Sequence, residues 1–345
     1  MAEQLYNKKN KDDLIKDLHS EDFSRLTLSF YQYVEIKDPA SLRDQMYRDL
    51  LVMKILGRIY VSTEGVNAQI SVPEHHKKDL LDYMNSRDEF SGAYMKEAVE
   101  DGESFYKLKI KIKDEIVAYG LDQSEYDMKK VGKHLSPEEF NKALEDPNCT
   151  VVDIRNHYES EVGHFKNAIL PDVDRSQEIL PEVKKTLEGK ENTKILLYCT
   201  GGIRCEKASS YLIKNNFTDV SQLDGGIIKY ANQVKKKKIK SKYIGKNFVF
   251  DNRLGERITL DIISSCHQCN KKNDSHTNCA NDLCHLLFIQ CDDCKLDYNG
   301  CCSKECSDYL LLTDDEKINQ KEDFLRYNEK RLKGRVKPKL YEIIN

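Results

Sequence analysis

The feature that most restricts the fold of this chain is a dense group of cysteines near its carboxyl end. Of the twelve cysteines, nine fall between Cys266 and Cys306. Several are closely paired, as in Cys266-x2-Cys269 and Cys291-x2-Cys294, and such pairs let two sulfurs reach one metal ion from a tight turn. The segment is too short and too polar to hold a core of its own, so we expect bound metal to organise it.

The cysteines of this segment suffice for two zinc ions, each held by four thiolates. The expected ligand sets are Cys266, Cys269, Cys291 and Cys294 for one ion, and Cys279, Cys284, Cys302 and Cys306 for the other. Cys301 is the alternative to Cys302 as a ligand in the second set. The histidines His267, His276 and His285 are candidates to replace a sulfur or to hydrogen-bond a ligand. An iron–sulfur cluster and free thiols without metal are the alternatives to zinc.

Length and composition indicate a soluble, intracellular protein of several compact units. The 345 residues are more than one small domain needs, and the 39% of hydrophobic residues supply real cores. The start has no apolar leader pattern, and no apolar run is long enough to cross a bilayer. A net charge of −3 gives no overall attraction to nucleic acid, so any such partner must meet a local patch. We expect a cytoplasmic protein without membrane attachment.

The first third of the chain predicts an α+β domain. Residues 1–24 are a charged extension without pattern, and residues 25–122 show the order βαββαβ of a ferredoxin-like, acylphosphatase-like fold. The expected strands are 26–34, 57–62, 68–72 and 107–113, the expected helices are 39–51 and 74–86, and the expected turn is 64–67. In the strand at 107–113, lysines alternate strictly with leucine and isoleucine. That lysine face is either a solvated sheet surface or, together with Arg58, an RNA contact.

The middle of the chain, residues 130–234, alternates strands and helices as a doubly wound parallel sheet does. The expected strands are 150–154, 195–198 and 220–223, and Ser136 opens a helix with a capping box. The lysine run at 235–242 ends this pattern. We expect residues 235–253 to be a basic linker, 254–310 to be the metal-binding module and 311–345 to be a charged helical tail.

Cys199 stands at the end of a predicted strand, directly before a helix that is expected to begin near Ile203. A strand-to-helix turn of this kind directs backbone N–H groups and the positive end of the helix dipole into one hollow. Gly201 and Gly202 allow the backbone angles that the turn needs, and Arg204 adds positive charge. The pKa of the Cys199 thiol is therefore expected below its free value of about 8.5, which makes a nucleophile at neutral pH. The alternative is a buried, inert cysteine.

Several motifs, in order, resemble the signatures of a rhodanese domain. They are Val152-Asp153-Ile154-Arg155, Gly163-His164-Phe165 with Ala168, Cys199-Thr200-Gly201-Gly202-Ile203-Arg204 and Leu223-Asp224-Gly225-Gly226-Ile227. The resemblance implies a persulfide or thiolate on Cys199, a loop sized for sulfur, and Asp153 and Arg155 as braces of that loop. His164 is either a further support or a structural histidine. Cys205 is either a resolving thiol for Cys199 or a small core residue.

The wider order of the chain resembles a narrower family, the rhodanese-containing, oxygen-dependent tRNA uridine hydroxylases. The resemblance rests on residues 57–69 (GRIYVSTEGVNAQ), on residues 248–253 (FVFDNR) and on the cysteine module, and it covers residues 25–310. It implies an oxidoreductase that converts the wobble uridine in the tRNA anticodon loop to 5-hydroxyuridine, with molecular oxygen as co-substrate. The loop residues that it implies are Cys199 and Arg204 for catalysis, with Thr200, Gly201, Gly202 and Ile203 in support.

For such a reaction we expect the Cys199 thiolate to add to C6 of uracil, which leaves carbanion character on C5 for capture of activated oxygen. RNA contact is expected at Lys235, Lys236, Lys237 and Lys238. Two other functions stay open. One is a sulfurtransferase that carries a persulfide on Cys199. The other is a non-catalytic scaffold that binds tRNA or protein through a rhodanese fold that has lost its activity. The presence of Cys199 and Arg204 argues against this function.

Overall fold

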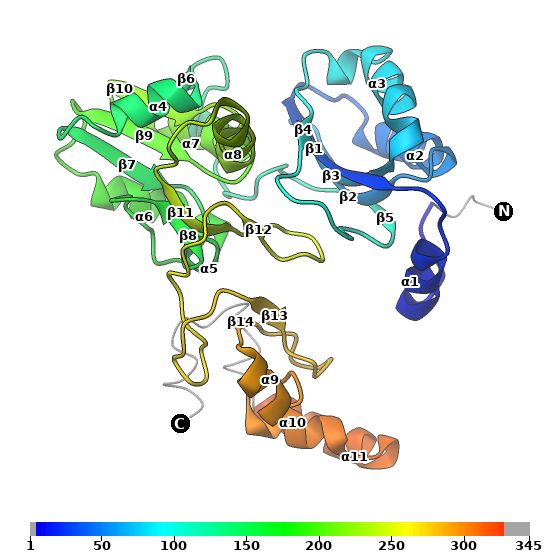
Figure 1. Ribbon diagram of the computed structural model, residues 1–345. Coiled ribbons are helices and arrows are strands. Elements are labelled where there is room, and N and C mark those ends of the chain that lie inside the picture. Colours follow the sequence, from blue (N-terminus) through cyan, green and yellow to red (C-terminus); the bar gives the residue numbers. More distant parts are fainter. Residues whose placement is uncertain (1–4, 328–345) are drawn as a thin grey trace.

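The computed structural model describes residues 5–327, and residues 1–4 and 328–345 lie outside the described part. Figure 1 shows an amino-terminal domain and a central domain side by side, with a cysteine-rich module beneath them. A short helix, α1 (Lys11–His19), precedes the first domain, and the Asn10 side chain caps it by accepting a hydrogen bond from the Asp13 N–H. Part of the charged extension at 1–24 is therefore helical.

The amino-terminal domain is a five-stranded sheet with two α-helices packed on one face. Its strands are β1 (Arg25–Tyr33), β2 (Leu56–Ser62), β3 (Gly65–Pro73), β4 (Lys96–Glu97) and β5 (Leu108–Ile112), its helices are α2 (Pro39–Val52) and α3 (Lys77–Asn85), and short 3₁₀ turns lie at Glu74–His76, Asp88–Phe90 and Gln123–Glu125. The strand order is β4-β1-β3-β2-β5. Inward residues such as Leu28 and Ile59 share one core with both helices, and the predicted ferredoxin-like α+β class is confirmed.

Two local predictions about this sheet are wrong. The strand at 107–113 was expected to close the βαββαβ order, but β4 takes that place by pairing antiparallel with β1, and β5 is added at the opposite edge, parallel to β2. A strand of two residues carries no alternating pattern, so nothing in the sequence marks β4. The predicted turn at 64–67 is shorter, because β3 already begins at Gly65, where a side chain would collide with the Gln32 carbonyl.

The central domain is a parallel sheet with helices on both faces, which confirms the predicted architecture. Its strands are β6 (Lys133–Leu135), β7 (Cys149–Asp153), β9 (Lys194–Tyr198) and β10 (Asp219–Leu223), in the order β6-β10-β9-β7. Its helices are α4 (Pro137–Ala143), α5 (His157–Ser160), α6 (Ser176–Thr186), α7 (Ile203–Lys214) and α8 (Gly226–Lys237). Leu197 packs on the side of α6 and α7, whereas Leu196 and Tyr198 pack on the side of α4 and α8. Both faces of β9 are therefore buried, and the chain leaves it at Cys199.

The structure corrects the predicted basic linker at 235–253. Helix α8 continues through Lys237, since lysines are good helix formers and interact favourably with the negative end of the helix dipole. Strand β11 (Tyr243–Asn247) then pairs antiparallel with β8 (Gly163–Phe165), and the Tyr243 ring is fully buried against Phe165. Much of this segment thus belongs to the central domain rather than connecting two parts.

The polar face of the amino-terminal sheet turns toward the central domain. Side chains alternate along a strand, so Tyr31 and Tyr33 of β1 point away from the core that Leu28 helps to form. Tyr31 donates a hydrogen bond to the Glu206 carboxylate at 2.9 Å, and Tyr33 donates to the Ile203 carbonyl at 3.2 Å. Both acceptors lie in the first turns of α7, so the sheet covers the start of this helix.

The cysteine module is small and has little regular structure. Its elements are β12 (Glu256–Arg257), β13 (His276–Asn278), β14 (Leu287–Ile289), α9 (Asp292–Asp297), α10 (Lys304–Leu311) and α11 (Asp314–Tyr327), of which β12 pairs with β11. The predicted helical tail agrees with α11, and its remainder lies outside the described residues. Within residues 5–327, no helix combines the length and the apolar character that a membrane span requires.

Candidate active site and metal centres

Cys199 stands where the sequence predicts, between the end of β9 and the start of α7. Gly202 closes the loop with a φ of +95°, and its N–H donates to the Cys199 sulfur at 3.1 Å. The turn before α8 packs behind this loop, because the Ile227 N–H donates to the Cys199 carbonyl at 3.0 Å. A side chain on Gly226 would collide with the same carbonyl. Gly225 and Gly226, the glycine pair of the last rhodanese-like motif, therefore allow the turn before α8 to contact the backbone of the Cys199 loop.

The environment of Cys199 favours its thiolate. The thiol is fully buried, and burial alone would raise its pKa. A hydrogen bond from the Cys205 thiol, the charge of Arg204 and the backbone N–H groups of these two residues outweigh burial and lower the pKa to about 6. Cys205 is also fully buried, which holds its own pKa well above the ordinary value. At neutral pH the loop thus holds one thiolate beside one thiol.

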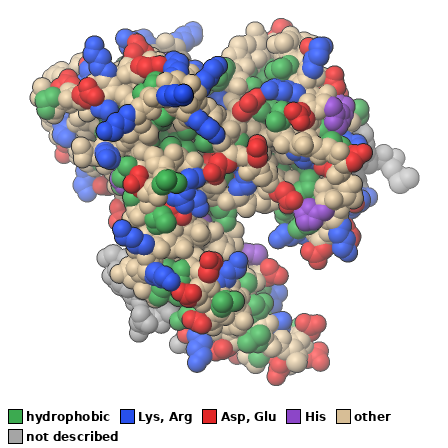
Figure 2. All heavy atoms as spheres, in the orientation of Figure 1, with side chains coloured by type: hydrophobic (Ala, Val, Ile, Leu, Met, Phe, Trp, Pro, Cys, Tyr) green, Lys and Arg blue, Asp and Glu red, His purple; other side chains and the backbone are tan. Residues whose placement is uncertain are grey.

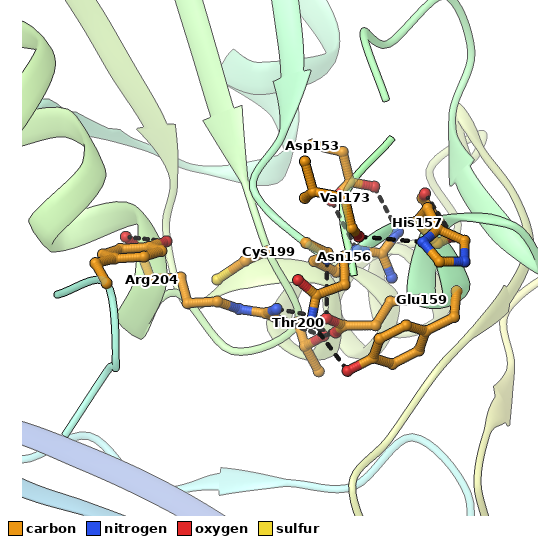
Figure 3. Close-up of polar contacts among 12 residues, drawn as sticks. Asp153, Asn156, His157, Glu159, Val173, Cys199, Thr200 and Arg204 are labelled. Atoms are coloured by element: carbon orange, nitrogen blue, oxygen red, sulfur yellow. Dashed lines mark hydrogen bonds and ion pairs between the residues drawn. The ribbon is translucent and has the colours of Figure 1, made fainter. Parts of the chain in front are cut away.

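Arg204 is fixed by a carboxylate that the sequence analysis did not single out. Its guanidinium donates to both oxygens of Glu159 at 2.6 and 2.7 Å and to the Thr200 hydroxyl at 3.2 Å, and Figure 3 shows it directed toward these residues. Glu159 lies in α5 and is fully buried. In the sequence, Glu159 is marked only by the capping box that it forms with Asn156. A capping box is a local feature and does not predict an ion pair with a residue 45 positions away.

Asp153 and Arg155, the predicted braces of the loop, pair with one another. Arg155 donates to the Asp153 carboxylate at 2.7 and 2.6 Å and to the Gly163 carbonyl at 2.7 Å, and both side chains are fully buried. This pair joins the end of β7 to β8, whereas the direct contact with the loop is made by Glu159. His164 lies in β8 with its Nδ1 3.0 Å from the Phe165 carbonyl, as a structural histidine would.

A cavity of about 370 Å³ separates the cysteine loop from the polar face of the amino-terminal sheet. It is lined from the sheet by Tyr31, Arg58, Tyr60, Asn67, Gln69 and Lys96, from the loop by Thr200, Gly201, Ile203 and Arg204, and from the segment after β11 by Phe250, Asp251 and Arg253. Aromatic and cationic side chains around a space of this size suit a planar, polar ligand. Many of these residues come from the stretches 57–69 and 248–253 that carried the wider family resemblance.

A second cavity of about 930 Å³ adjoins the first, since Arg58, Tyr60 and Phe250 line both. Its other lining residues include Tyr106, Lys109, Lys111, Asn278 and His285. The lysine face of β5 therefore lines a concave surface beside the site rather than an open side of the sheet.

The lysine run Lys235–Lys238, the main predicted RNA contact, lies apart from both cavities. All four side chains are exposed at the end of α8, and none of them lines either space. Lys237 forms an ion pair with Glu138 at 2.6 Å. On the face shown in Figure 2, basic and acidic side chains are mixed over all three parts of the molecule.

The predicted metal ligands converge in two groups. The sulfurs of Cys266, Cys269, Cys291 and Cys294 lie within 4.8 Å of one another, and so do those of Cys279, Cys284, Cys302 and Cys306. Backbone N–H groups point at these sulfurs, since Cys291 donates to Cys266 and Cys302 donates to Cys279, both at 3.4 Å. Four converging sulfurs with N–H donors fit a tetrahedral, thiophilic metal ion such as zinc.

Cys301 and the three candidate histidines belong to neither of these two groups. Cys301 is fully buried, and its carbonyl accepts hydrogen bonds from the side chains of Gln268 and Gln290, both at 3.1 Å. His267 lies 2.7 Å from the Glu161 carboxylate, which joins the module to the central domain. Cys301 and His267 therefore support the module from outside the two groups, whereas His276 packs against Phe248 and His285 is exposed beside Asp282.

Comparisons with known proteins agree with this three-part geometry. Residues 25–116 match the model of the UPF0176 acylphosphatase like domain, residues 136–233 that of the rhodanese-like domain and residues 244–307 that of the rhodanase C-terminal region. A tRNA uridine(34) hydroxylase of Leptospira interrogans serogroup Icterohaemorrhagiae serovar Lai is 50% identical over 98% of this chain and 93% of its own. Proteins of the same name are 44% identical in Salmonella typhi, over 89% of each chain, and 45% identical in Pectobacterium carotovorum subsp. carotovorum, over 89% of this chain and 87% of that one. This chain belongs to the tRNA uridine(34) hydroxylase family.

Proposed function

We propose that this protein is an oxidoreductase of the monooxygenase type that hydroxylates the wobble uridine, uridine 34, of tRNA to 5-hydroxyuridine. Molecular oxygen is the co-substrate, and Cys199 is the nucleophile. Family membership supports the reaction. The observation that carries the proposal is the cavity that places an aromatic and cationic surface directly over the loop of a buried thiolate.

The chemistry follows from the polarity of the uracil ring. The Cys199 thiolate bonds to C6, and the electron pair of the C5–C6 double bond moves toward the C4 carbonyl, which leaves C5 electron-rich for reaction with oxygen. After one oxygen atom has been transferred to C5, C5 loses its proton, the sulfur–C6 bond breaks and the double bond returns. When the oxygen–oxygen bond breaks, the Cys205 sulfur takes up the other oxygen atom as a sulfenic acid. The released Cys199 thiolate then displaces this oxygen as water and forms a disulfide with Cys205, which an external thiol reduces between turnovers.

The substrate base approaches across Gly201. A side chain at this position would meet only one neighbour within 4 Å, the Lys96 side chain, so the backbone of Gly201 forms an open floor of the cavity. The Cys199 sulfur lies fully buried beneath the loop. Binding of the base must therefore shift the loop to expose the sulfur, a substrate-induced loop movement of the kind that many enzymes use.

The rest of the anticodon loop extends from the first cavity into the second. Bases stack on Tyr60 and Phe250, while Arg58, Lys109 and Lys111 meet phosphates. The exposed run Lys235–Lys238 is an outer, long-range contact. Two structural zinc ions hold the cysteine module, and because the substrate is tRNA, the enzyme works in the cytoplasm.

A rhodanese-type sulfurtransferase with a persulfide on Cys199 is the second candidate. The observation that favours it is the tight cradle of N–H groups around a single sulfur. Sulfur transfer, however, does not require the side chains with which the amino-terminal sheet lines the cavity. The two functions share one cysteine and are separated by their products.

Nucleoside analysis of tRNA decides between them. Wild-type protein should restore 5-hydroxyuridine to the tRNA of a deletion strain when oxygen is present, and Cys199→Ser should not. Transfer of sulfur from thiosulfate to cyanide is measured beside it. Wild-type protein that transfers sulfur at a good rate while 5-hydroxyuridine stays absent would favour the sulfurtransferase.

A further inference from the structure

Lys96 of the amino-terminal domain reaches into the cavity from β4. It pairs with Ser29 of β1 in the sheet register, and its side chain is only 5% exposed. Its Cε lies 3.8 Å from the place where a side chain would begin on Gly201, and its ammonium lies 4.6 Å from the centre of the Tyr31 ring. A cation from a different domain is therefore placed directly over the cysteine loop.

The ammonium of Lys96 forms no ion pair with a carboxylate of the described residues, and the Cys199 thiolate acts on it only through its charge. Among the residues that the structure describes, no carboxylate or carbonyl accepts a hydrogen bond from it, and its ring contacts with Tyr31 and Tyr94 are its direct interactions. The neighbouring Lys229 differs, because it forms an ion pair with Asp224 at 2.5 Å. Because the mostly buried Lys96 side chain lines the cavity, its ammonium can reach a ligand bound there.

The ionisation of Lys96 matches this position. Burial, with a further contribution from Lys229, lowers its pKa to about 8, against the opposing pull of the Cys199 thiolate. The charged groups that surround it are Cys199, Glu206, Asp224 and Lys229. At neutral pH the ammonium is still largely protonated, and it gives up its proton more readily than a solvated lysine.

We propose that Lys96 is a catalytic residue of this site and that its ammonium binds and protonates the oxygen that becomes anionic when the Cys199 thiolate adds to the pyrimidine. In this step the sulfur–C6 bond forms, the C5–C6 electron pair moves to O4, and a proton passes from Nζ to O4. The proton returns to the amine when the C4 carbonyl is restored, so the step consumes no acid. The proposal rests on the proposed hydroxylase function. It assigns to Lys96 the stabilisation of the oxyanion that forms at O4 in the first step of that reaction.

The test compares Lys96→Met and Lys96→Arg with Lys78→Met, a lysine on α3 whose ion pair with Asp82 is exposed. The full-length proteins are assayed on tRNA for the formation of 5-hydroxyuridine, and kcat is separated from KM. Lys96→Met should lower kcat by roughly 100-fold or more, because it removes an oxyanion donor, and should leave the KM for tRNA within a few-fold. Lys96→Arg should recover part of that loss, and Lys78→Met should match wild type.

Two further readouts separate catalysis from a structural role. The wild-type kcat should fall as the pH rises through about 8, where Lys96 loses its proton, and this fall should be absent in Lys96→Arg. Alkylation of Cys199 by iodoacetamide is measured well above the thiol's pKa of about 6, where loss of the Lys96 charge no longer changes the thiolate fraction, and should proceed at the wild-type rate in Lys96→Met. Thermal stability should not decrease, because methionine fills the space without a charge.

The outcomes are distinct. Lys96→Met with a wild-type kcat overturns the proposal, and so does a loss of kcat that is matched by an equal loss of Cys199 alkylation. Wild-type protein that forms no 5-hydroxyuridine at all contradicts the proposed function itself, and this is visible before any Lys96 variant is compared.

Discussion

The cysteine loop and the cysteine module both have to balance the negative charge of thiolate sulfurs, and they do so in different ways. In both, backbone N–H groups point at sulfur atoms. In the loop, one sulfur is balanced by protein groups alone, chiefly Cys205 and Arg204, and it lies beneath a cavity. In the module, eight sulfurs converge in two groups of four. The difference teaches that a single thiolate balanced by protein groups beneath a cavity suits chemistry, whereas four converging sulfurs suit a structural metal ion.

The strongest test of this contrast removes one ligand from the module. Cys294→Ser should lower the bound zinc from two ions to one per chain and unfold part of the module, because structural zinc contributes on the order of 10 kcal/mol to folding. Elemental analysis and limited proteolysis measure both effects. Cys301→Ala is the matched control, since this buried cysteine lies outside both ligand groups. Two zinc ions retained by Cys294→Ser would end the assignment of this group as a metal site.

A smaller effect is expected when the loop loses its carboxylate. Glu159→Gln leaves the buried Arg204 without its counter-charge, and breaking a buried ion pair in this way costs about 3–5 kcal/mol. The free energy of unfolding from urea titration should fall by that amount, with zinc content unchanged. Glu138→Gln, which removes an exposed partner of Lys237, should leave it unaltered. An unchanged stability in Glu159→Gln would show that protein charges do not balance the loop as we describe.

The smallest effect concerns the hydrogen bond between the two thiols of the loop. Cys205→Ala removes a donor that lowers the pKa of Cys199, so the pKa should rise from about 6 by less than roughly one unit. Only the thiolate is alkylated, so the rate climbs as the pH passes the pKa, and the midpoint of this climb moves upward in the variant. Mass spectrometry of the Cys199 peptide follows it. Cys149→Ala, outside the site, should not move the midpoint, and a downward shift in Cys205→Ala would contradict the assigned donor.

Both cysteine regions could be read from the sequence because their geometry is local. A strand, two glycines and a helix start fix the loop around Cys199, and close spacing already brings Cys266 and Cys269 to one side of a turn. The same holds for the continuous apolar run Ile195–Tyr198, which predicts the buried strand that the structure places as β9.

The partners of these regions could not be read in the same way. Glu159 meets Arg204 across 45 residues, and Lys96 sits in a strand of two residues that shows no periodicity. The run Lys235–Lys238 attracted attention by its charge, yet its place at the end of a helix, away from the cavities, depends on how α8 packs. Contacts between separate domains join residues that are far apart in the chain, so no regular spacing in the sequence predicts them.

The phenolic groups of Tyr31 and Tyr33 tie the first strand of the protein to the beginning of helix α7. The loop of Cys199 is consequently covered by a part of the polypeptide that is made more than one hundred residues before it. A central domain released from this cover would expose Gly201 and the rest of the loop above the sulfur to water and small solutes. Under the proposed function, the amino-terminal sheet selects the molecules that reach the sulfur, and the specificity of the enzyme depends on how these two layers are held together.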